Sequence, residues 1–314
     1  MLTAAIDLGG TALKLGVCDA GRLTSQVETP LDGPVHLDTV AAALREQLQG
    51  RGLSAVGIAV PGIVDGAGTG LLAAHGKYAE LHDTDLSAWA QEEFGCPATV
   101  ENDARAALIG EVGAGAGAGA GARPRNAALL VLGTGIGTAV LLDGHLLRGA
   151  NRHAGVLGGH ISVAFDGPRC PCGNVGCAEL FASTWAIREA ADDGTLAMGT
   201  MLRRRWDAHG AIGVRDIVET RHEAESAMIL DRCLDVWATV LVDQCHSFDP
   251  ELLIVTGGVM RSSALLLPEL TRRVHRSLWS SAYRPPLVTP ADPSTSVLRG
   301  IAALASHPDK EGNR

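Results

Sequence analysis

The chain has 314 residues, of which 46% are hydrophobic and 19% are charged, and its formal net charge at pH 7 is −9. This length and composition predict an ordinary soluble globular protein with two domains, each large enough for its own core. The acidic balance argues against nucleic acid as a partner, because nucleic-acid binding needs a basic face. No apolar run approaches the length that spans a bilayer, so no membrane association is expected.

The seven cysteines divide into a cluster of three and four that stand apart from one another. The isolated ones, in apolar surroundings, are Cys18, Cys96, Cys233 and Cys245. This usage predicts a reduced, intracellular protein, and we expect a cytoplasmic one. The apolar N-terminus meets Asp7 at once, which is not the pattern of a signal peptide.

The N-terminal part is predicted to alternate strands and helices. A strand over residues 2–6 leads through Asp7-Leu-Gly-Gly-Thr11 into a second strand over 13–17, which predicts a hairpin. Further along, His75, Lys77 and Tyr78 could line a pocket, but a surface loop is the simpler expectation for them. The other elements expected here are a helix over 39–48, a strand over 55–60, turn-rich chain over 63–85, a helix over 86–94, and a strand over 97–103 that runs into a helix starting near 104.

The first glycine turn has the chemistry of a phosphate-binding loop. Gly9 and Gly10 let backbone N–H groups and the Thr11 hydroxyl approach a phosphate closely. Asp7 at the strand end could hold a magnesium ion, and Lys14 could add positive charge. From this turn alone, a plain hairpin with a solvated carboxylate and amine is the simpler interpretation.

Asp103 stands where a predicted strand ends and a helix begins. The position suits a helix N-cap, which either Asn102 or Asp103 would make well. It also suits a general base, since a carboxylate that opens into a cleft can accept a proton from a substrate hydroxyl. These residues alone favour the cap, and the wider context has to decide.

The middle of the chain repeats the pattern of its beginning. Residues 113–122 alternate Gly and Ala, which we interpret as a flexible connection between domains. A strand over 127–132, the turn Gly133-Thr-Gly-Ile-Gly137 and a strand through Leu142 follow. One such glycine turn is weak evidence of phosphate binding. Two of them, one in each half of the chain, predict that the phosphates of a nucleotide are bound from both sides.

Residues 155–179 carry a predicted metal site. The sulfur ligands are Cys170, Cys172 and Cys177. With His160 they make the ligand set of a closed tetrahedral zinc site, which is structural because it leaves no position for water. Such an ion would pin a long irregular loop. His153 is an alternative to His160, and three chance cysteines in a cytosolic loop are the alternative to a metal site.

The rest of the chain is predicted to be mainly helical. Helices are expected over 184–192, 196–208, 214–220, 223–248 and 296–306, with an apolar strand over 252–255 and a loop over 285–293. Thr256-Gly-Gly258 lets a flat group such as adenine lie on the backbone, whereas a plain tight turn is the simpler alternative. The last helix could pack back on the first domain.

In this order, and over nearly the whole chain, these motifs resemble the ROK family of repressors, open reading frames and sugar kinases. The matching pieces are Asp7-Leu-Gly-Gly-Thr11 with Lys14, Pro61-Gly62, Glu101-Asn-Asp103 through Gly110-Glu111, Leu132-Gly-Thr-Gly-Ile-Gly137, Gly159-His160, Cys170-Pro-Cys-Gly-Asn-Val-Gly-Cys177 with Glu179, and Asp249-Pro250 with Thr256-Gly-Gly258. The resemblance implies an α/β, two-domain, actin-like (ribonuclease-H-like) ATPase fold. We expect a small domain at 1–112 completed by the C-terminal helix 295–314, and a larger domain at 113–294 with the zinc loop at 155–179.

The resemblance also implies an ATP-dependent sugar kinase that uses ATP and Mg²⁺, contains a structural Zn²⁺ and forms a homodimer. Asp103 matches the family's catalytic base. Asn102, His160 and Glu179 match residues that bind sugar hydroxyls, and His160 also matches a zinc ligand. The nucleotide-binding matches are Asp7, Gly9, Gly10, Thr11 and Lys14 around the first phosphate loop, Gly133, Thr134 and Gly135 in the second, and Gly257 and Gly258 on the adenosine side. Closure about residues 113–122 would bring the two loops together around the phosphates.

The stretch before His160 departs from the family pattern Ala-Gly-Glu-x-Gly-His. It reads Ala154-Gly-Val-Leu-Gly-Gly-His160, with one extra residue and with Val156 or Leu157 in place of a sugar-binding glutamate. Losing such contacts should cost about 1–3 kcal/mol with an ordinary hexose. The expected substrate is therefore a hexose or an N-acetylhexosamine, whose methyl group suits an apolar position, and the accepting hydroxyl is usually the 6-OH in this family.

Two other classes of protein share parts of this pattern. A sugar-responsive repressor needs a DNA-binding helix-turn-helix ahead of the first phosphate loop, and only six residues precede Asp7. A catalytically weak sugar-binding or sensing protein would explain the missing glutamate, but Asp103 and both phosphate loops count against it.

Overall fold

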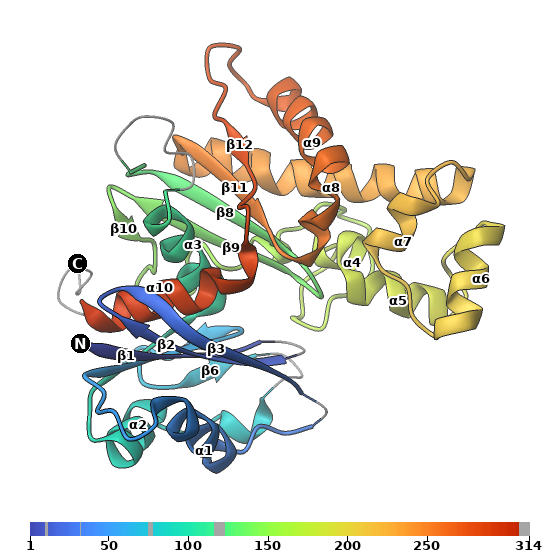
Figure 1. Ribbon diagram of the computed structural model, residues 1–314. Helices are drawn as coiled ribbons and strands as arrows, with labels where there is room; N and C mark the ends of the chain where they lie inside the picture. Colours follow the sequence, from blue (N-terminus) through green and yellow to red (C-terminus); the bar gives the residue numbers. More distant parts are fainter. Residues whose placement is uncertain (10–11, 32, 75–77, 116–122, 308–314) are drawn as a thin grey trace. The chain divides into compact units, whose positions relative to one another are not determined.

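The computed structural model describes residues 1–9, 12–31, 33–74, 78–115 and 123–307, which divide into two compact α/β units (Figure 1). The first unit contains Met1–Arg123, Ala139–Val156 and Asp292–Arg314, and the second contains Pro124–Thr138 and Leu157–Ala291. Of the described residues expected in the larger domain, 113–115, 123, 139–156 and 292–294 lie in the first unit. Among the described residues, no helix combines the length and hydrophobicity needed to cross a membrane.

The first unit is built on a five-stranded sheet with the order β3-β2-β1-β4-β7. Its strands are β1 (Leu2–Leu8), β2 (Ala12–Asp19), β3 (Arg22–Pro30), β4 (Ala55–Val60) and β7 (Ala98–Asn102). The predicted hairpin is confirmed, because β1 pairs antiparallel with β2 and places Asp7 opposite Lys14. β4 lies parallel to both β1 and β7. The ends of β1 and β7, which carry Asp7 and Asn102, therefore face the same edge of the sheet.

Helices cover both faces of this sheet, with α1 and α2 on one face and α10 on the other (Figure 1). The helices are α1 (Leu37–Leu48), α2 (Leu86–Phe94), α3 (Asp103–Gly113) and α10 (Ser296–Ser306). Short elements complete the unit, namely β5 (Ile63–Val64), β6 (Leu71–Ala73), η1 (Ala79–Leu81) and η4 (Pro293–Thr295). Burial on both faces explains why β1 and β4 are almost continuously apolar.

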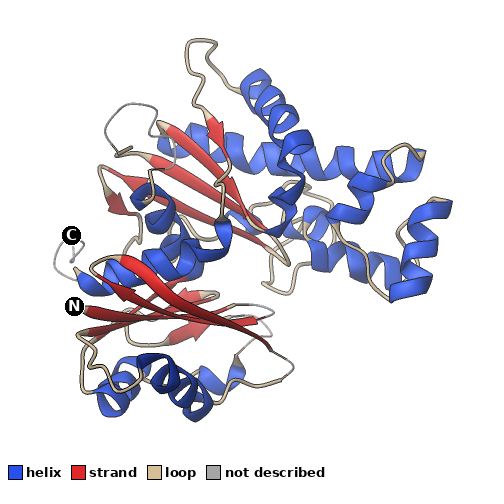
Figure 2. Cartoon of the chain, viewed as in Figure 1, coloured by secondary structure: helices blue, strands red, loops and turns tan. Residues whose placement is uncertain are grey.

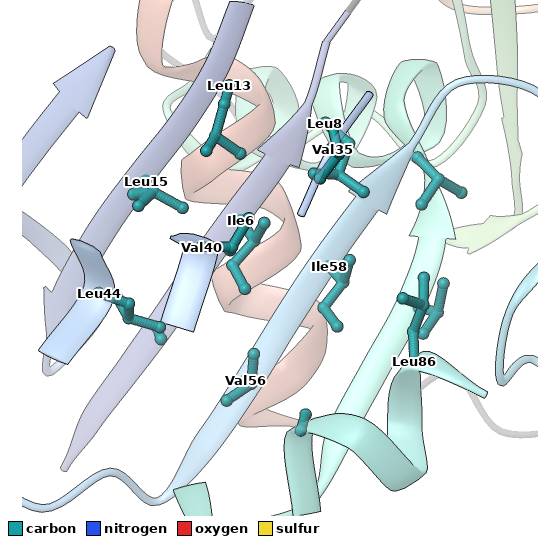
Figure 3. Close-up of a cluster of buried hydrophobic side chains, with 14 of the residues drawn as sticks. Ile6, Leu8, Leu13, Leu15, Val35, Val40, Leu44, Val56, Ile58 and Leu86 are labelled. Carbon is teal, nitrogen blue, oxygen red and sulfur yellow. The ribbon is translucent and has the colours of Figure 1, made fainter. Parts of the chain in front are cut away.

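The core between the sheet and α1 and α2 is purely hydrophobic (Figure 3). On the other face, α3 and α10 touch through their backbones. A Cβ atom on Gly110 would lie 2.0 Å from the Ser296 carbonyl oxygen, and one on Gly300 would lie 1.7 Å from that of Ala106. Only glycine fits at these two crossing points, so the last helix is locked onto the helix that begins at Asp103.

A second five-stranded sheet has the order β10-β9-β8-β11-β12, with β11 parallel to β8 and to β12. Its strands are β8 (Ala127–Leu132), β9 (Ile136–Leu142), β10 (His145–Leu146), β11 (Leu252–Thr256) and β12 (Leu287–Val288). The start of β9 belongs to the second unit, and its remainder belongs with β10 to the first. The prediction of a loop over 285–293 is wrong at β12.

The second unit is rich in helices, as Figure 2 shows. They are η2 (Gly158–His160), α4 (Glu179–Ala182), α5 (Thr184–Asp192), α6 (Thr200–His209), α7 (Val214–Glu219), α8 (Ala224–Phe248), η3 (Gly258–Ser262) and α9 (Ser263–Ser277). The 25-residue helix α8 packs against β8, α4, α7 and α9. The predicted helices are confirmed, except that α6 begins four residues later than expected, at Thr200.

Candidate functional site

Asp7 lies at the end of β1 with only 5% of its surface exposed. Burial and the negative charge of Asp103 raise the pKa of its carboxyl to about 7, although Lys14 opposes this rise. The Gly9 N–H donates to the Ala12 carbonyl (3.0 Å), and a Cβ on Gly9 would lie 2.7 Å from that oxygen. The turn therefore needs glycine at position 9. Gly10 and Thr11 lie outside the described residues.

Tyr78 closes against this first turn from the chain that precedes η1. Its hydroxyl donates to the Gly9 carbonyl, and its ring packs against the core of the first unit. Burial, together with the charges of Asp7 and Asp103, raises the pKa of Tyr78 far above its usual range. The expectation of a surface position is therefore wrong for Tyr78, whereas His75 and Lys77 lie outside the described residues. An aromatic ring in a turn-rich stretch was the available signal, but nothing in the sequence indicates which turn it meets.

Asn102 supplies the cap of α3. Its side-chain oxygen accepts from the Arg105 N–H (3.1 Å), and its amide donates to the Gly62 carbonyl (2.9 Å) and to Asp103 Oδ1 (3.2 Å). Asp103 is the first residue of the helix, and its Oδ1 accepts from the Ala104 N–H (2.8 Å). The choice left open by the sequence is thus decided for Asn102 as the cap.

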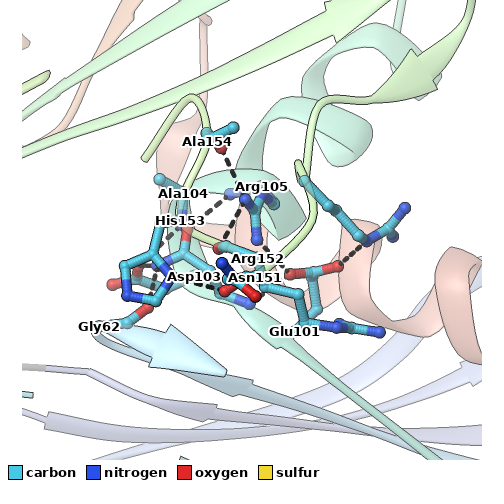
Figure 4. Close-up of polar contacts among 11 residues, drawn as sticks. Gly62, Glu101, Asp103, Ala104, Arg105, Asn151, Arg152, His153 and Ala154 are labelled. Carbon is cyan, nitrogen blue, oxygen red and sulfur yellow. Dashed lines mark hydrogen bonds and ion pairs between the residues drawn. The ribbon is translucent and has the colours of Figure 1, made fainter. Parts of the chain in front are cut away.

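A buried ion network lies behind this helix start (Figure 4). Arg105 and Glu101 are 0% and 1% exposed, and they pair at 3.2 Å, while Arg148 Nε donates to the other Glu101 oxygen at 2.8 Å. Arg105 also donates to the carbonyls of Arg152 (3.0 Å) and Ala154 (2.7 Å). Burial raises the pKa of Glu101, but the charges of Arg148 and Arg105 outweigh it, so the net shift is downward. The network ties the Asp103 segment to residues 148–154.

The second glycine turn, residues 133–137, joins β8 to β9. Its Gly133 N–H donates to the Gly135 carbonyl (3.1 Å). Glu179 accepts from the Ile136 N–H (2.8 Å) through one oxygen and from the Trp185 indole N–H (3.1 Å) through the other. Glu179, matched to a sugar ligand by resemblance, thus contacts this turn. Trp185 carried no signal in the sequence, because its partner is reached only through the fold.

The four predicted metal ligands come together in the second unit. The donor atoms of His160, Cys170, Cys172 and Cys177 all lie within 4.8 Å of one another. Two pairs of neighbours are 3.6 Å (Cys172 and Cys177 Sγ) and 3.7 Å (Cys170 Sγ and His160 Nδ1) apart. His153 is not in this cluster; its Nδ1 lies 2.5 Å from the Asn151 carbonyl oxygen.

The two glycines after β11 differ in their surroundings. Gly257 has φ +98°, and a Cβ there would lie 2.2 Å from the Leu132 carbonyl oxygen. Its glycine is therefore explained by close packing against the end of β8. A Cβ on Gly258 would meet nothing within 4 Å, which is compatible with a group lying against the backbone there.

The two residues before His160 that could replace the family's glutamate, Val156 and Leu157, differ in how far they are buried. Val156 is 8% exposed and therefore part of a core, whereas Leu157 is 40% exposed. After them, the Gly158 N–H donates to the buried Thr138 hydroxyl (2.9 Å). Of the two residues that could take the glutamate's place, Leu157 is the one with an exposed side chain.

The predicted site residues thus divide between the units. Of the described ones, Asp7, Gly9, Lys14, Asn102 and Asp103 lie in the first unit. The remainder lie in the second unit, namely Gly133, Thr134, Gly135, His160, Cys170, Cys172, Cys177, Glu179, Gly257 and Gly258.

The chain is similar to known proteins both in sequence and in fold. The model of the ROK family matches residues 3–307. A glucokinase from Streptomyces coelicolor is 32% identical over 98% of this chain and 98% of its own length. A xylose repressor from Caldicellulosiruptor bescii is 35% identical, covering 72% of this chain and 55% of the repressor. The crystal structure of a ROK family glucokinase from Streptomyces griseus in complex with glucose and AMPPNP superposes with a TM-score of 0.80 and 29% identity, over 98% of this chain and all of that one.

Proposed function

Because the chain belongs to the ROK family, we propose that it is an ATP-dependent sugar kinase that transfers the γ-phosphate to the 6-OH of a hexose or an N-acetylhexosamine. The observation that carries the proposal is the placement of Asp103 at the start of α3, directly after β7, where its charge acts on the buried Asp7 at the same edge of the sheet, with β4 between β1 and β7. The glucose and AMPPNP bound to the related Streptomyces griseus enzyme support the same pair of substrates.

In this proposal Asp103 is the general base. A carboxylate within hydrogen-bond reach of the sugar hydroxyl accepts its proton as the oxygen attacks the γ-phosphorus. The Ala104 N–H and the Asn102 amide both bond to Asp103 Oδ1, which holds the carboxylate in one orientation.

Asp7 and Asp103 suit a magnesium site. Burial and the charge of Asp103 raise the pKa of Asp7, and a divalent cation would remove that penalty. Asp7 would hold the ion, directly or through water, and Lys14 stands opposite it in the hairpin. When bound, Mg²⁺ supplies positive charge to offset the charge on the phosphoryl oxygens.

The Cys/His cluster suits a structural zinc ion. Two sulfurs bound tetrahedrally at roughly 2.3 Å from one zinc are about 3.8 Å apart, close to the separations of 3.6 and 3.7 Å between neighbouring ligand atoms. Burial and the other two cysteines raise the pKa of the Cys177 thiol to about 12, so three thiolates together need a cation. The ion would close the loop over 160–177 and hold His160 at the sugar-binding position implied by the family.

Leu157 bears on the choice of sugar. Val156 or Leu157 takes the place of the sugar-binding glutamate of the family pattern, and of the two Leu157 has the exposed side chain. An apolar group there favours a substrate that carries an apolar substituent, such as the methyl of an N-acetyl group, over one that presents two hydroxyls. We therefore expect N-acetylhexosamines to compete well with glucose as substrates.

A coupled ATPase assay across hexoses and N-acetylhexosamines tests the proposal. Turnover of at least one of these sugars, dependent on Mg²⁺, is expected, and Leu157→Glu should shift preference toward glucose. The match to a xylose repressor favours one competing function, a sugar-sensing protein with weak catalysis. Measurable sugar binding with no turnover of any sugar would decide for that function. A homodimer in the cytoplasm remains part of the proposal, and light scattering tests the dimer.

A further inference from the structure

The second glycine turn, residues 133–137, has few side chains with which to define its own shape. Gly133, Gly135 and Gly137 leave only Thr134 and Ile136. Glycine backbone loses more conformational entropy on ordering than any other, so such a segment holds one shape only when outside contacts impose it. Those contacts come from the junction of α4 and α5.

The first residues of α5 hold the carbonyl side of the turn. The Thr184 N–H donates to the Gly133 carbonyl (3.2 Å), and the Trp185 N–H donates to the Thr134 carbonyl (3.0 Å). These are N–H groups of a helix N-terminus, which lack partners inside the helix. The carbonyls of the turn therefore accept from the first two N–H groups of α5, and α5 in return orients two peptide groups of the turn.

Glu179 holds the N–H side. Its Oε2 accepts from the Ile136 N–H at 2.8 Å, and a Cβ built on Gly135 would lie 2.6 Å from the same oxygen. The carboxylate thus occupies the space that a side chain at position 135 would need. Its Oε1 accepts from the Trp185 indole N–H at 3.1 Å, so both oxygens are engaged in one orientation. Charge-assisted hydrogen bonds of this kind are the strong ones.

We propose that Glu179 and Trp185 are positioning residues for the nucleotide. The Trp185 indole orients the Glu179 carboxylate, and the carboxylate holds the Ile136 N–H so that the turn keeps the shape that receives the phosphoryl groups. The inference rests on the proposed function of residues 133–135 as a phosphate loop. It adds a nucleotide-side role to a residue that family resemblance assigns to the sugar.

Trp185→Phe tests the inference, because it removes the indole N–H and keeps most of the aromatic surface. Titration calorimetry with Mg²⁺ and AMPPNP, in the absence of sugar, should show about tenfold weaker binding, which corresponds to about 1.4 kcal/mol. The KM for ATP should rise in parallel, with the KM for sugar changed less than twofold. Trp237→Phe is the matched control, since that indole donates to the Ala182 carbonyl (2.9 Å) within the same unit. It should lower the melting temperature and leave both KM values unchanged.

A double-mutant cycle separates orientation from general damage. In a Glu179→Gln background, Trp185→Phe should weaken AMPPNP binding less than twofold, because the carboxylate that the indole orients is gone. Gly135→Ala displaces the same carboxylate from the other side and should weaken AMPPNP binding in a wild-type background. Additive losses in the cycle would overturn the inference, as would a Trp185→Phe variant that binds AMPPNP like wild type or resembles Trp237→Phe. Wild-type protein that binds no AMPPNP would refute the proposed function itself and this inference with it.

Discussion

The Asp103 segment in the first unit and the second glycine turn in the second unit are held in contrasting ways. Behind Asp103, Arg105 and Glu101 form a buried pair whose charges are built into the chain and are present as soon as it folds. The glycine turn is held by Glu179, two residues after Cys177, in a loop whose Cys/His cluster suits a metal ion. We therefore expect the first support to be permanent and the second to depend on a bound metal ion.

This difference predicts how each region should lose its structure. A buried ion pair is costly to desolvate, but it is very costly to break, because one charge is then left unpaired. A metal-tied loop loses its organisation when the ion leaves, since folding and binding are linked. We therefore expect damage to the first region to depend on mutation alone and damage to the second to depend also on zinc.

The largest expected effect is that of Cys172→Ser. Loss of one thiolate ligand should release zinc and lower the free energy of unfolding by on the order of 5 kcal/mol, because metal binding is part of the folding energy of such a loop. Metal analysis and thermal unfolding measure the two effects. Cys96→Ala is the control, since Cys96 is buried and remote from the cluster in sequence. An unchanged melting temperature and zinc content for Cys172→Ser would contradict a structural metal.

Arg105→Met should have the second largest effect on stability. It leaves Glu101 buried beside Arg148 alone and frees the carbonyls of Arg152 and Ala154, at a cost of about 3–5 kcal/mol. Denaturant unfolding with and without a zinc chelator tests the comparison directly, because the loss should be the same in both conditions. A loss that disappears on chelation would show that the two supports are not independent. Arg273→Met removes another many-partnered arginine, in the second unit, as a control.

Asp103→Asn tests the proposed role of Asp103, the residue whose segment is held by the buried ion pair, as the general base. It should lower kcat by about 10²–10⁴-fold, because an amide cannot accept the sugar proton, while AMPPNP affinity stays within about twofold. Coupled kinetics and calorimetry measure the two quantities. Asp85→Asn makes the same exchange at the N-cap of α2, where Asn caps as well as Asp, and should change neither. Retained turnover in Asp103→Asn would remove the assignment of Asp103 as the base.

The smallest effect concerns Asp7 and pH. Its pKa is raised from 3.8 to about 7 by burial and by Asp103, so the folded state binds this proton more tightly than the unfolded state. The stability that Asp7 contributes is therefore complete below pH 4 and is lost as pH rises to 7. Without Mg²⁺ and nucleotide, Asp7→Asn should raise the melting temperature by a few °C at pH 8 and by nothing at pH 4. An equal change at both pH values would contradict the raised pKa.

Many of the longer strands and helices and the membership of the Cys/His cluster could be predicted from the sequence, because each depends on local periodicity or on ligands close together along the chain. The hairpin from β1 to β2 and the junction at Asn102 and Asp103 are such cases. The strands β3 and β12 and the helix α9 were not predicted. The motifs and their order along the chain were also enough to recognise the family.

Only the tertiary structure decided which partners these segments meet. Nothing in the chain pairs Arg105 with carbonyls near residue 153, Glu179 with Ile136, or Tyr78 with Gly9, because those contacts join residues 43–69 positions apart. It also decided that Leu157, and not Val156, presents its side chain outside a core. Local pattern sets which element forms, whereas burial and long-range hydrogen bonds exist only once the units have packed.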